Sequence, residues 1–104
     1  MPRGPGVTSL LLLAAIRDGR AYGLDLVAGT GLPSGTVYPT LGRLRKRGLI
    51  RAHWEDQRVA DRDGRPRRRY YDLTPEGLRV LEEGTERMAH LTAELQSRTA
   101  TGEA

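Results

Sequence analysis

The sequence contains no cysteine and no phenylalanine, and it has one tryptophan and two histidines. Without cysteine the chain forms no disulfide, no cysteine-ligated metal site and no thiol nucleophile. The histidines, His53 and His90, lie far apart and lack the spacing of metal ligands. We therefore expect neither a metal nor another cofactor.

Long apolar runs are scarce as well. The run Leu10–Ile16 is too short to cross a bilayer, and Arg17 and Asp18 follow it where a signal peptide would have a small-residue cleavage site. We therefore expect a cytoplasmic protein outside the membrane. No nucleophile with a neighbouring base, no paired carboxylates and no glycine-rich phosphate loop stand out, so an enzyme is not predicted.

Basic residues outnumber acidic ones, 17 to 13, and Lys46 is the single lysine among them. Positive charge suits a polyanionic partner, but it does not distinguish nucleic acid from an acidic membrane surface. An arginine excess also arises in GC-rich genomes. The length of 104 residues predicts one domain, and a core of this size favours dimerisation, because a second copy buries further apolar area.

The chain begins with a segment rich in proline and glycine, and residues 1–8 are predicted to form a flexible arm. Thr8 or Ser9 is a suitable N-cap for a first helix that ends near Ile16. That helix contains four consecutive leucines and is apolar on every side. The pattern predicts burial against both the core and a partner, although a wholly internal helix would have the same pattern.

A second helix is expected at about residues 22–28, and a third from its N-cap Ser34 to about Arg47. The predicted inner face of the third helix consists of Val37, Leu41 and Leu44. Its outer face combines small residues and Pro39 with basic residues, which lets a helix backbone lie close to a large partner. The alternative is that Pro39 and the glycines merely kink a surface helix.

Two strands, residues 49–55 and 67–73, are predicted to form a hairpin around a long polar loop with a mobile tip, residues 56–66. The aromatic residues are expected to alternate as strand core, which does not favour an RNA-stacking platform; they are Trp54, Tyr70 and Tyr71. Six arginines crowd the tip and the returning strand. Such a tip suits a minor groove or its phosphates, although a solvated charged face is the alternative.

Thr74 is predicted to cap a last helix, residues 75–96, with Pro75 at its first position, and residues 97–104 are expected to be disordered. Apolar residues at heptad spacing along this helix predict pairing with a second copy, supported by the first helix. The predicted dimer interface comprises Leu10, Leu11, Leu13, Leu81, Met88, Leu91 and Leu95.

The order helix, helix, helix, hairpin, helix is that of a winged helix-turn-helix. The expected fold class is therefore mainly α with a small β-hairpin (α+β), in which residues 9–74 bind DNA and residues 75–96 dimerise. Three stretches resemble the PadR family of transcriptional regulators, in particular its small subfamily with a single helix after the wing. They are DGRAYGLDL at 18–26, SGTVYPTL at 34–41 and RYYDLTPEG at 69–77.

The resemblance implies a homodimer, formed largely by the first and last helices, that represses transcription by occupying promoter DNA. It also implies relief by a small aromatic or cationic ligand in many members, a DNA contact from Tyr38 and a wing tip at Gly64. The wing loop is longer and more acidic here than a compact glycine tip. The dimer helices contain no aromatic residue, so an aromatic-lined pocket between the subunits is not expected.

A two-fold dimer predicts a palindromic operator in double-stranded DNA. Arg43 is predicted to read bases, whereas Lys46 and the wing arginines position the protein on phosphates; Arg45 and Arg47 are assigned to solubility. The predicted DNA-binding residues are Ser34, Gly35, Thr36, Tyr38, Pro39, Arg43, Lys46, Gly64, Arg65, Arg67 and Arg68. The alternative function is a winged-helix protein-interaction module without sequence-specific DNA binding.

Overall fold

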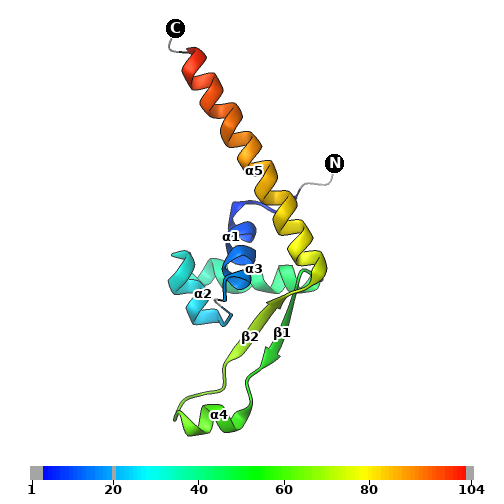
Figure 1. Cartoon of the computed structure of the whole chain (residues 1–104). Helices are drawn as coiled ribbons and strands as arrows, with labels where there is room; N and C mark the ends of the chain where they lie inside the picture. Colours follow the sequence, from blue (N-terminus) through cyan, green and yellow to red (C-terminus); the bar gives the residue numbers. More distant parts are fainter. Residues whose placement is uncertain (1–3, 20, 103–104) are drawn as a thin grey trace.

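The computed structural model describes residues 4–19 and 21–102. A hairpin and a long helix project in opposite directions from a small helical body (Figure 1). The elements are α1 (Val7–Arg17), α2 (Gly23–Thr30), α3 (Ser34–Lys46), β1 (Ile50–Trp54), α4 (Gln57–Arg62), β2 (Arg69–Leu73) and α5 (Pro75–Gly102). The predicted winged helix-turn-helix order is confirmed, with α4 as an additional element.

The core lies where α1, α2 and α3 meet the hairpin base and the first turns of α5. The predicted inner face of α3 is confirmed, since none of Val37, Leu41 and Leu44 is more than 1% exposed. Burial of each leucine stabilises the fold by about 1.5–3 kcal/mol relative to an exposed side chain. Contacts of this one face with α1, α2 and β1 therefore determine where α3 lies.

Helix α1 begins two residues earlier than predicted, so Val7 and Thr8 belong to the helix and not to an arm. Its N-cap is Gly6 instead of Thr8 or Ser9. The preceding Pro5 is buried, and its carbonyl accepts a hydrogen bond of 3.2 Å from the Arg87 side chain of α5. This packing lets α1 start close to α5. Residues 1–3 of the predicted arm lie outside the described residues.

The turn between α2 and α3 depends on Gly31, whose φ of +73° is a left-handed conformation that favours glycine. The N-cap of α3 is Pro33, so the prediction that Ser34 caps the helix is wrong by one residue. Helix α3 ends at Lys46, and Gly48, at φ +75°, turns the chain toward β1. The helix thus ends within one residue of its predicted boundary.

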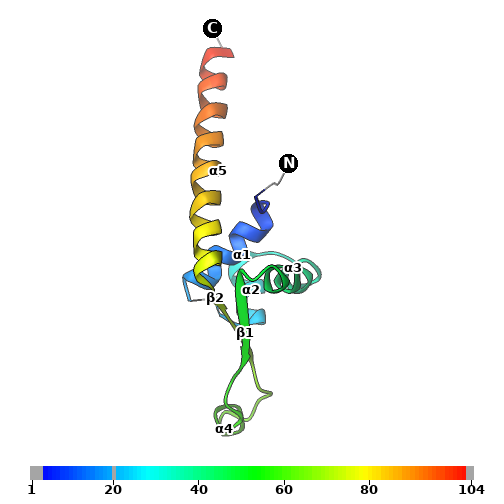
Figure 2. The ribbon, with the colours of Figure 1, turned by 90° about the vertical axis from the view of Figure 1, so that its right-hand side faces the viewer.

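Strands β1 and β2 pair antiparallel, with Ile50 opposite Leu73 and Trp54 opposite Arg69. Both strands are shorter than predicted. The chain before α2 also joins the hairpin, because the Tyr71 N–H donates to the Ala21 carbonyl at 2.7 Å. The hairpin is therefore anchored at its base, while its tip extends beyond the helical body (Figure 2).

The prediction that residues 56–66 form only a loop is wrong, because they include the helix α4. The Asp56 carboxylate caps this helix by accepting from the Arg58 N–H at 2.9 Å. Ala60 is fully buried within the tip. One short helical turn with a small buried residue therefore occupies the end of the wing.

The N-terminus of α5 is capped as predicted. The Gly77 N–H donates to the Thr74 hydroxyl at 2.9 Å, and that hydroxyl donates to the Gly48 carbonyl at 2.7 Å. A Cβ at Gly77 would lie 1.9 Å from the Leu49 carbonyl oxygen, so this close contact requires glycine.

The far half of α5 stands clear of the body (Figure 1). Every side chain from Ala89 to Arg98 is exposed. The helix continues to Gly102, so the prediction of disorder from residue 97 is wrong as far as residue 102. Residues 103–104 lie outside the described part of the chain. A solvated helix of this length, with leucines on its surface, is typical of a helix that pairs with a partner.

Candidate nucleic-acid interface

The outer face of α3 is open along its length. Gly35, Tyr38 and Pro39 are exposed. A Cβ built at Gly35 or Gly42 would meet no other atom within 4 Å. The small residues therefore leave the helix backbone accessible, as the sequence predicts, and a large partner can approach this face closely.

The basic residues in the last turn of α3 and at its C-cap are exposed and have no acidic partner among the residues that the structure describes. They are Arg43, Arg45, Lys46 and Arg47. The Arg43 guanidinium donates to the Thr40 hydroxyl at 3.0 Å, and Thr40 donates in turn to the Thr36 carbonyl at 2.7 Å. Thr40, which the sequence analysis did not single out, thus orients Arg43, whose remaining donors are available to a ligand.

Tyr38 projects from α3 and lies against the start of α2. A Cβ added at Gly23 would come within 2.7 Å of the Tyr38 ring and hydroxyl, so a larger residue there would displace the Tyr38 side chain. Tyr38 is nevertheless 45% exposed. The ring therefore packs closely on Gly23, and it also lines a cavity shared with the hairpin.

Arg65, predicted to contact phosphate, is engaged within the hairpin. Its guanidinium donates to both carboxylate oxygens of Glu55, at 2.7 and 2.9 Å, and to Asp63 at 3.3 Å. Glu55 also accepts from the Tyr70 hydroxyl and the Arg68 N–H. These bonds, first of all that from Arg65, lower the pKa of Glu55 to about 2. Arg65 therefore fastens the two arms of the wing together.

Gly64, the predicted wing tip, ends α4 with a φ of +66°, and its N–H donates to the Asp61 carbonyl. It follows α4 in the turn that leads the chain back toward β2. Its position agrees with a turn residue, while the helix before it forms the outer end of the wing.

The returning arginines stack on aromatic rings. The Arg67 and Arg69 guanidinium carbons lie 5.0 and 5.6 Å from the Trp54 ring centre, and that of Arg68 lies 4.2 Å from the Tyr22 ring centre. Trp54 is 53% exposed, so its prediction as a core residue is wrong. It occupies the same strand face as the buried Ile50, but at a position that the helical body no longer covers.

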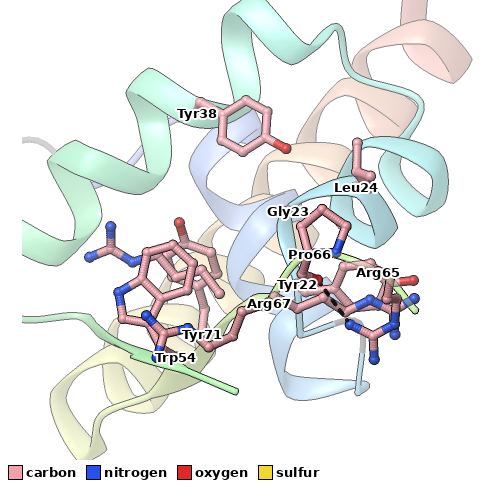
Figure 3. A pocket seen from close by; sticks show the side chains of 11 residues that line it. Tyr22, Gly23, Leu24, Tyr38, Trp54, Arg65, Pro66, Arg67 and Tyr71 are labelled. Carbon is pink, nitrogen blue, oxygen red and sulfur yellow. Dashed lines mark hydrogen bonds between the residues drawn. The ribbon is translucent and has the colours of Figure 1, made fainter. Parts of the chain in front are cut away.

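A cavity of about 550 Å³ separates α3 from the hairpin. Tyr38 lies on one side of it and Trp54, Tyr71 and Arg67 on the other, with Leu24 of α2 at the edge (Figure 3). Tyr38 of α3 and the arginines of the hairpin therefore share one face of the molecule. The structure thus brings together residues from the two predicted DNA-binding segments.

Arg45 and Arg69 were not predicted as site residues. Together with Tyr38 and Gly42 they line a second, smaller cavity of about 220 Å³ between α3 and β2. The three-residue and four-residue spacings of Tyr38, Gly42 and Arg45 place them on one side of α3, and this regularity is a signal that sequence reasoning could have used.

The predicted dimer residues fall into two groups. Leu10, Leu13 and Leu81 are at most 7% exposed and belong to the core of the single chain. Leu11, Leu91 and Leu95 are 44–57% exposed, and Met88 is partly buried beside the core. An apolar groove of about 360 Å³ runs between α1 and α5 and includes Leu11 and Met88.

Comparison with protein families identifies the fold's relatives. The profile of the transcriptional regulator PadR-like family matches residues 12–83, from α1 to the first part of α5. The chain belongs to the PadR-like family of transcriptional regulators. This membership makes it a DNA-binding regulator and not an enzyme. Among curated proteins, none matches the sequence.

Solved structures share this fold, and some of them are PadR-family regulators. A PadR-family regulator from Clostridium difficile R20291 aligns with a TM-score of 0.78 at 23% identity, over 88% of this chain and 97% of that one. A PadR-family regulator from Eggerthella lenta is 31% identical, with a TM-score of 0.66, over 84% and 79%. BpsR of Bordetella bronchiseptica aligns with a TM-score of 0.70 at 24% identity, over 90% and 67%.

Two kinds of feature are absent from the described residues of this PadR-family chain. Within residues 4–19 and 21–102, no helix combines the length and the apolar character needed to span a bilayer. The same residues contain no cluster of three metal-binding side chains.

Proposed function

We propose that this PadR-family regulator is a homodimeric repressor that binds a palindromic operator. In each subunit α3 enters the major groove, and the hairpin lies on the adjacent backbone and minor groove. The observation that carries the proposal is the shared face of α3 and the wing, on which Tyr38 and Arg67 border the same cavity.

Arg43 is the proposed base-reading residue. It is exposed and is held by Thr40 in the last turn of α3. A guanidinium suits the paired acceptors of guanine in the major groove. The N–H groups of Ser34 and Gly35 contact phosphate, because the first turn of a helix leaves N–H groups without acceptors. Lys46, at the other end of α3, contacts phosphate with its charged side chain.

The remaining residues complete the surface. Thr36, Tyr38 and Pro39 border the base-reading face of α3. Arg67 and Arg68 neutralise the backbone beside the groove, whereas Arg65 and Gly64 maintain the shape of the wing. This division follows from the pairing of Arg65 with Glu55, which leaves less of its charge for phosphate.

The proposed dimer forms through α1 and the far half of α5. Leu11, Met88, Leu91 and Leu95 supply the contact, and Leu10, Leu13 and Leu81 support it from the core. Leu91 and Leu95 lie on the far half of α5, where no other part of the described chain covers them and a second copy can. A two-fold dimer would place two copies of α3 about 34 Å apart, or a multiple of this spacing, on one side of the duplex.

Repression and ligand response follow from the same geometry. A protein of this size acts most simply by occupying promoter DNA and excluding other proteins from it. The structural relative BpsR has its DNA binding regulated by 6-hydroxynicotinic acid. We propose by analogy that a small-molecule effector controls operator binding here as well.

The DNA half of the proposal is tested by selecting bound duplexes from random DNA at two salt concentrations. One palindrome should emerge, and its affinity should fall steeply with salt. Arg43→Ala should relax preference at one base pair of each half-site and weaken binding by about 1–3 kcal/mol. Tyr38→Ala should weaken binding as well, whereas Arg98→Ala, on the far half of α5, should not.

The absence of any enriched sequence, with Arg43→Ala binding like the parent, would refute the proposal. The winged-helix protein-interaction module would then become the working hypothesis.

The dimer half is tested by sedimentation equilibrium. Leu91→Glu should give monomers, because it places a charge in the contact without disturbing the protomer, in which Leu91 is 50% exposed. Gln96→Glu is the matched control, since it adds the same charge about 140° further round α5. A parent chain that is monomeric, or a dimer that survives Leu91→Glu, would contradict the proposed interface.

A further inference from the structure

We propose that Arg45 of α3 and Arg69 of β2 together hold one backbone phosphate of DNA, so that the helix and the hairpin contact the duplex at a shared point. This shared contact rests on the proposed function, because it requires that α3 and the hairpin face the operator. Neither residue has a DNA contact in the proposed function, and the sequence pattern assigns Arg45 to solubility. The two side chains come from separate elements and line one small cavity.

The cavity between α3 and β2 has room for one small group and not for a whole ligand. Its volume is about 220 Å³, below the roughly 300–1,000 Å³ of sites that enclose a small molecule. Leu41, Gly42 and Tyr71 also line it. A Cβ built at Gly42 would meet no other atom within 4 Å, so the missing side chain leaves the α3 side of the cavity open. A single phosphate of a larger polyanion fits such a space.

The charged side chains at this cavity favour an anion. Arg45 and Arg69 both line it, and neither forms an ion pair with an acid among the described residues. Two like charges at one site repel each other, and an anion between them offsets that repulsion. A guanidinium also presents paired N–H donors that match two oxygens of a phosphate. Charge and hydrogen-bond donors therefore both select a phosphate.

Arg69 has a hydrogen-bond donor that the described chain leaves unused. Its Nε is buried, and no acceptor for it lies within residues 4–19 and 21–102. Its guanidinium carbon lies 5.6 Å from the Trp54 ring centre, in a cation–π contact that needs none of its N–H donors. Because an unpaired buried donor is destabilising, a rotation of the side chain that brings Nε to a phosphate oxygen is favoured.

Arg45 and the proposed base-reading residue Arg43 lie on different sides of α3. They are about 160° apart around the helix axis. Arg45 shares its side with Tyr38 and Gly42, next to β2. Arg43 can therefore face base edges while Arg45 contacts the backbone beside the hairpin. A phosphate held by Arg45 and Arg69 fixes the position of α3 along the groove, and so the base pair that Arg43 reaches.

The test maps single phosphates on the palindromic duplex recovered from random DNA. Each backbone phosphate in turn is replaced in both half-sites by a neutral methylphosphonate, and fluorescence anisotropy gives the affinity of the full chain. Arg45→Gln and Arg69→Gln should each weaken binding of the intact duplex by about tenfold for each half-site, because charge-assisted hydrogen bonds are lost. One methylphosphonate position should cost the parent about tenfold for each half-site but both variants at most about threefold, because the group it replaces is already poorly held.

Two further variants serve as controls. Arg47→Gln removes the same charge from the exposed C-cap of α3, outside the cavity, and its sensitive phosphates should be those of the parent. Arg69→Lys keeps the charge but lacks the paired donors, so both its affinity and its sensitivity at the shared position should be intermediate. This variant replaces Arg69→Gln in the comparison if circular dichroism shows that Arg69→Gln is unfolded.

The shared contact is excluded if the Arg45 and Arg69 variants lose sensitivity at different phosphates, or if both keep the parent pattern. Failure of the parent to bind any duplex would instead refute the proposed function, and the shared contact with it. A duplex bound by the parent therefore separates an error in this contact from an error in the function.

Discussion

Helix α3 and the β1–β2 hairpin border the same cavity, but different forces hold them in place. Val37, Leu41 and Leu44 anchor α3 in the apolar core, while its basic residues are unpaired with any acid among the described residues. The hairpin tip is held mainly by Glu55 and Arg65 and by arginines stacked on Trp54. Helix α3 is thus positioned by apolar burial and keeps its charged side chains available. The hairpin, in contrast, uses many of its charged side chains in contacts that hold its own shape.

This difference shows why a count of arginines overstates the charge that a wing offers to DNA. It also predicts that acid, which acts on carboxylates, should loosen the hairpin before it affects the placement of α3. The following experiments test the comparison, from the largest expected effect to the smallest.

Removing part of the α3 anchor should have the largest effect. Leu41→Ala should lower the free energy of unfolding by about 2–5 kcal/mol, because it leaves a cavity at a position that is 1% exposed. Urea denaturation followed by circular dichroism gives the value. Arg47→Ala, on the exposed end of the same helix, should change it by less than about 0.5 kcal/mol. Similar values for the two variants would show that α3 is not held by the core.

The free charges of α3 should matter more for DNA than the paired charges of the wing. Lys46→Gln should lower affinity for all sequences alike and reduce the slope of log affinity against log salt by about 1. Arg58→Gln should change the slope less, since the Arg58 guanidinium is already paired with Asp56 at 3.0 Å. Equal changes in slope from the two variants would contradict the comparison.

Acid should remove the contribution of the Glu55 clasp. The pKa of Glu55 is lowered from 4.5 to about 2 on folding, so its contribution is present above pH 4.5 and is lost as the pH falls toward 2. Glu55→Gln should therefore be less stable than the parent at neutral pH, and the difference should shrink through this window. Urea midpoints measured across it give the result, with Glu86→Gln as an exposed control. A difference independent of pH would exclude the carboxylate as its source.

The smallest effect should come from the outer partner of Arg65. Asp63→Asn should change the free energy of unfolding by less than about 0.5 kcal/mol, because Asp63 is half-exposed. The hydrogen bond of 3.3 Å that it accepts from Arg65 is also longer than the two that Glu55 accepts from the same guanidinium. The same urea titrations measure it. A loss as large as that in Glu55→Gln would mean that the clasp depends on both acids equally.

Much of the fold follows from local patterns. The helical spacing of Val37, Leu41 and Leu44 and the cap at Thr74 predict what the structure contains. Helix α4 escaped prediction because it has no apolar periodicity and lies among loop-forming residues; the cap at Asp56 was its one available signal. Helix α5 was predicted to end early because its last turns carry no apolar stripe.

The candidate site was predictable in part. The outer face of α3 was identified from its small and basic residues. Trp54 was misassigned because strand alternation gives the face of a side chain but not whether the body reaches far enough to cover it. Arg65 counted as free charge in the sequence, since its partner Glu55 lies ten residues away across the hairpin.

The amino-acid sequence by itself determined the order of the elements, the buried side of α3, the family and the class of partner, because these depend on residue spacing and composition along the chain. The tertiary structure alone decided which arginines remain free, which leucines are left outside the core, and that Trp54 and Tyr38 face one cavity. Each of these depends on distances between segments far apart in the chain, and local pattern does not encode those distances.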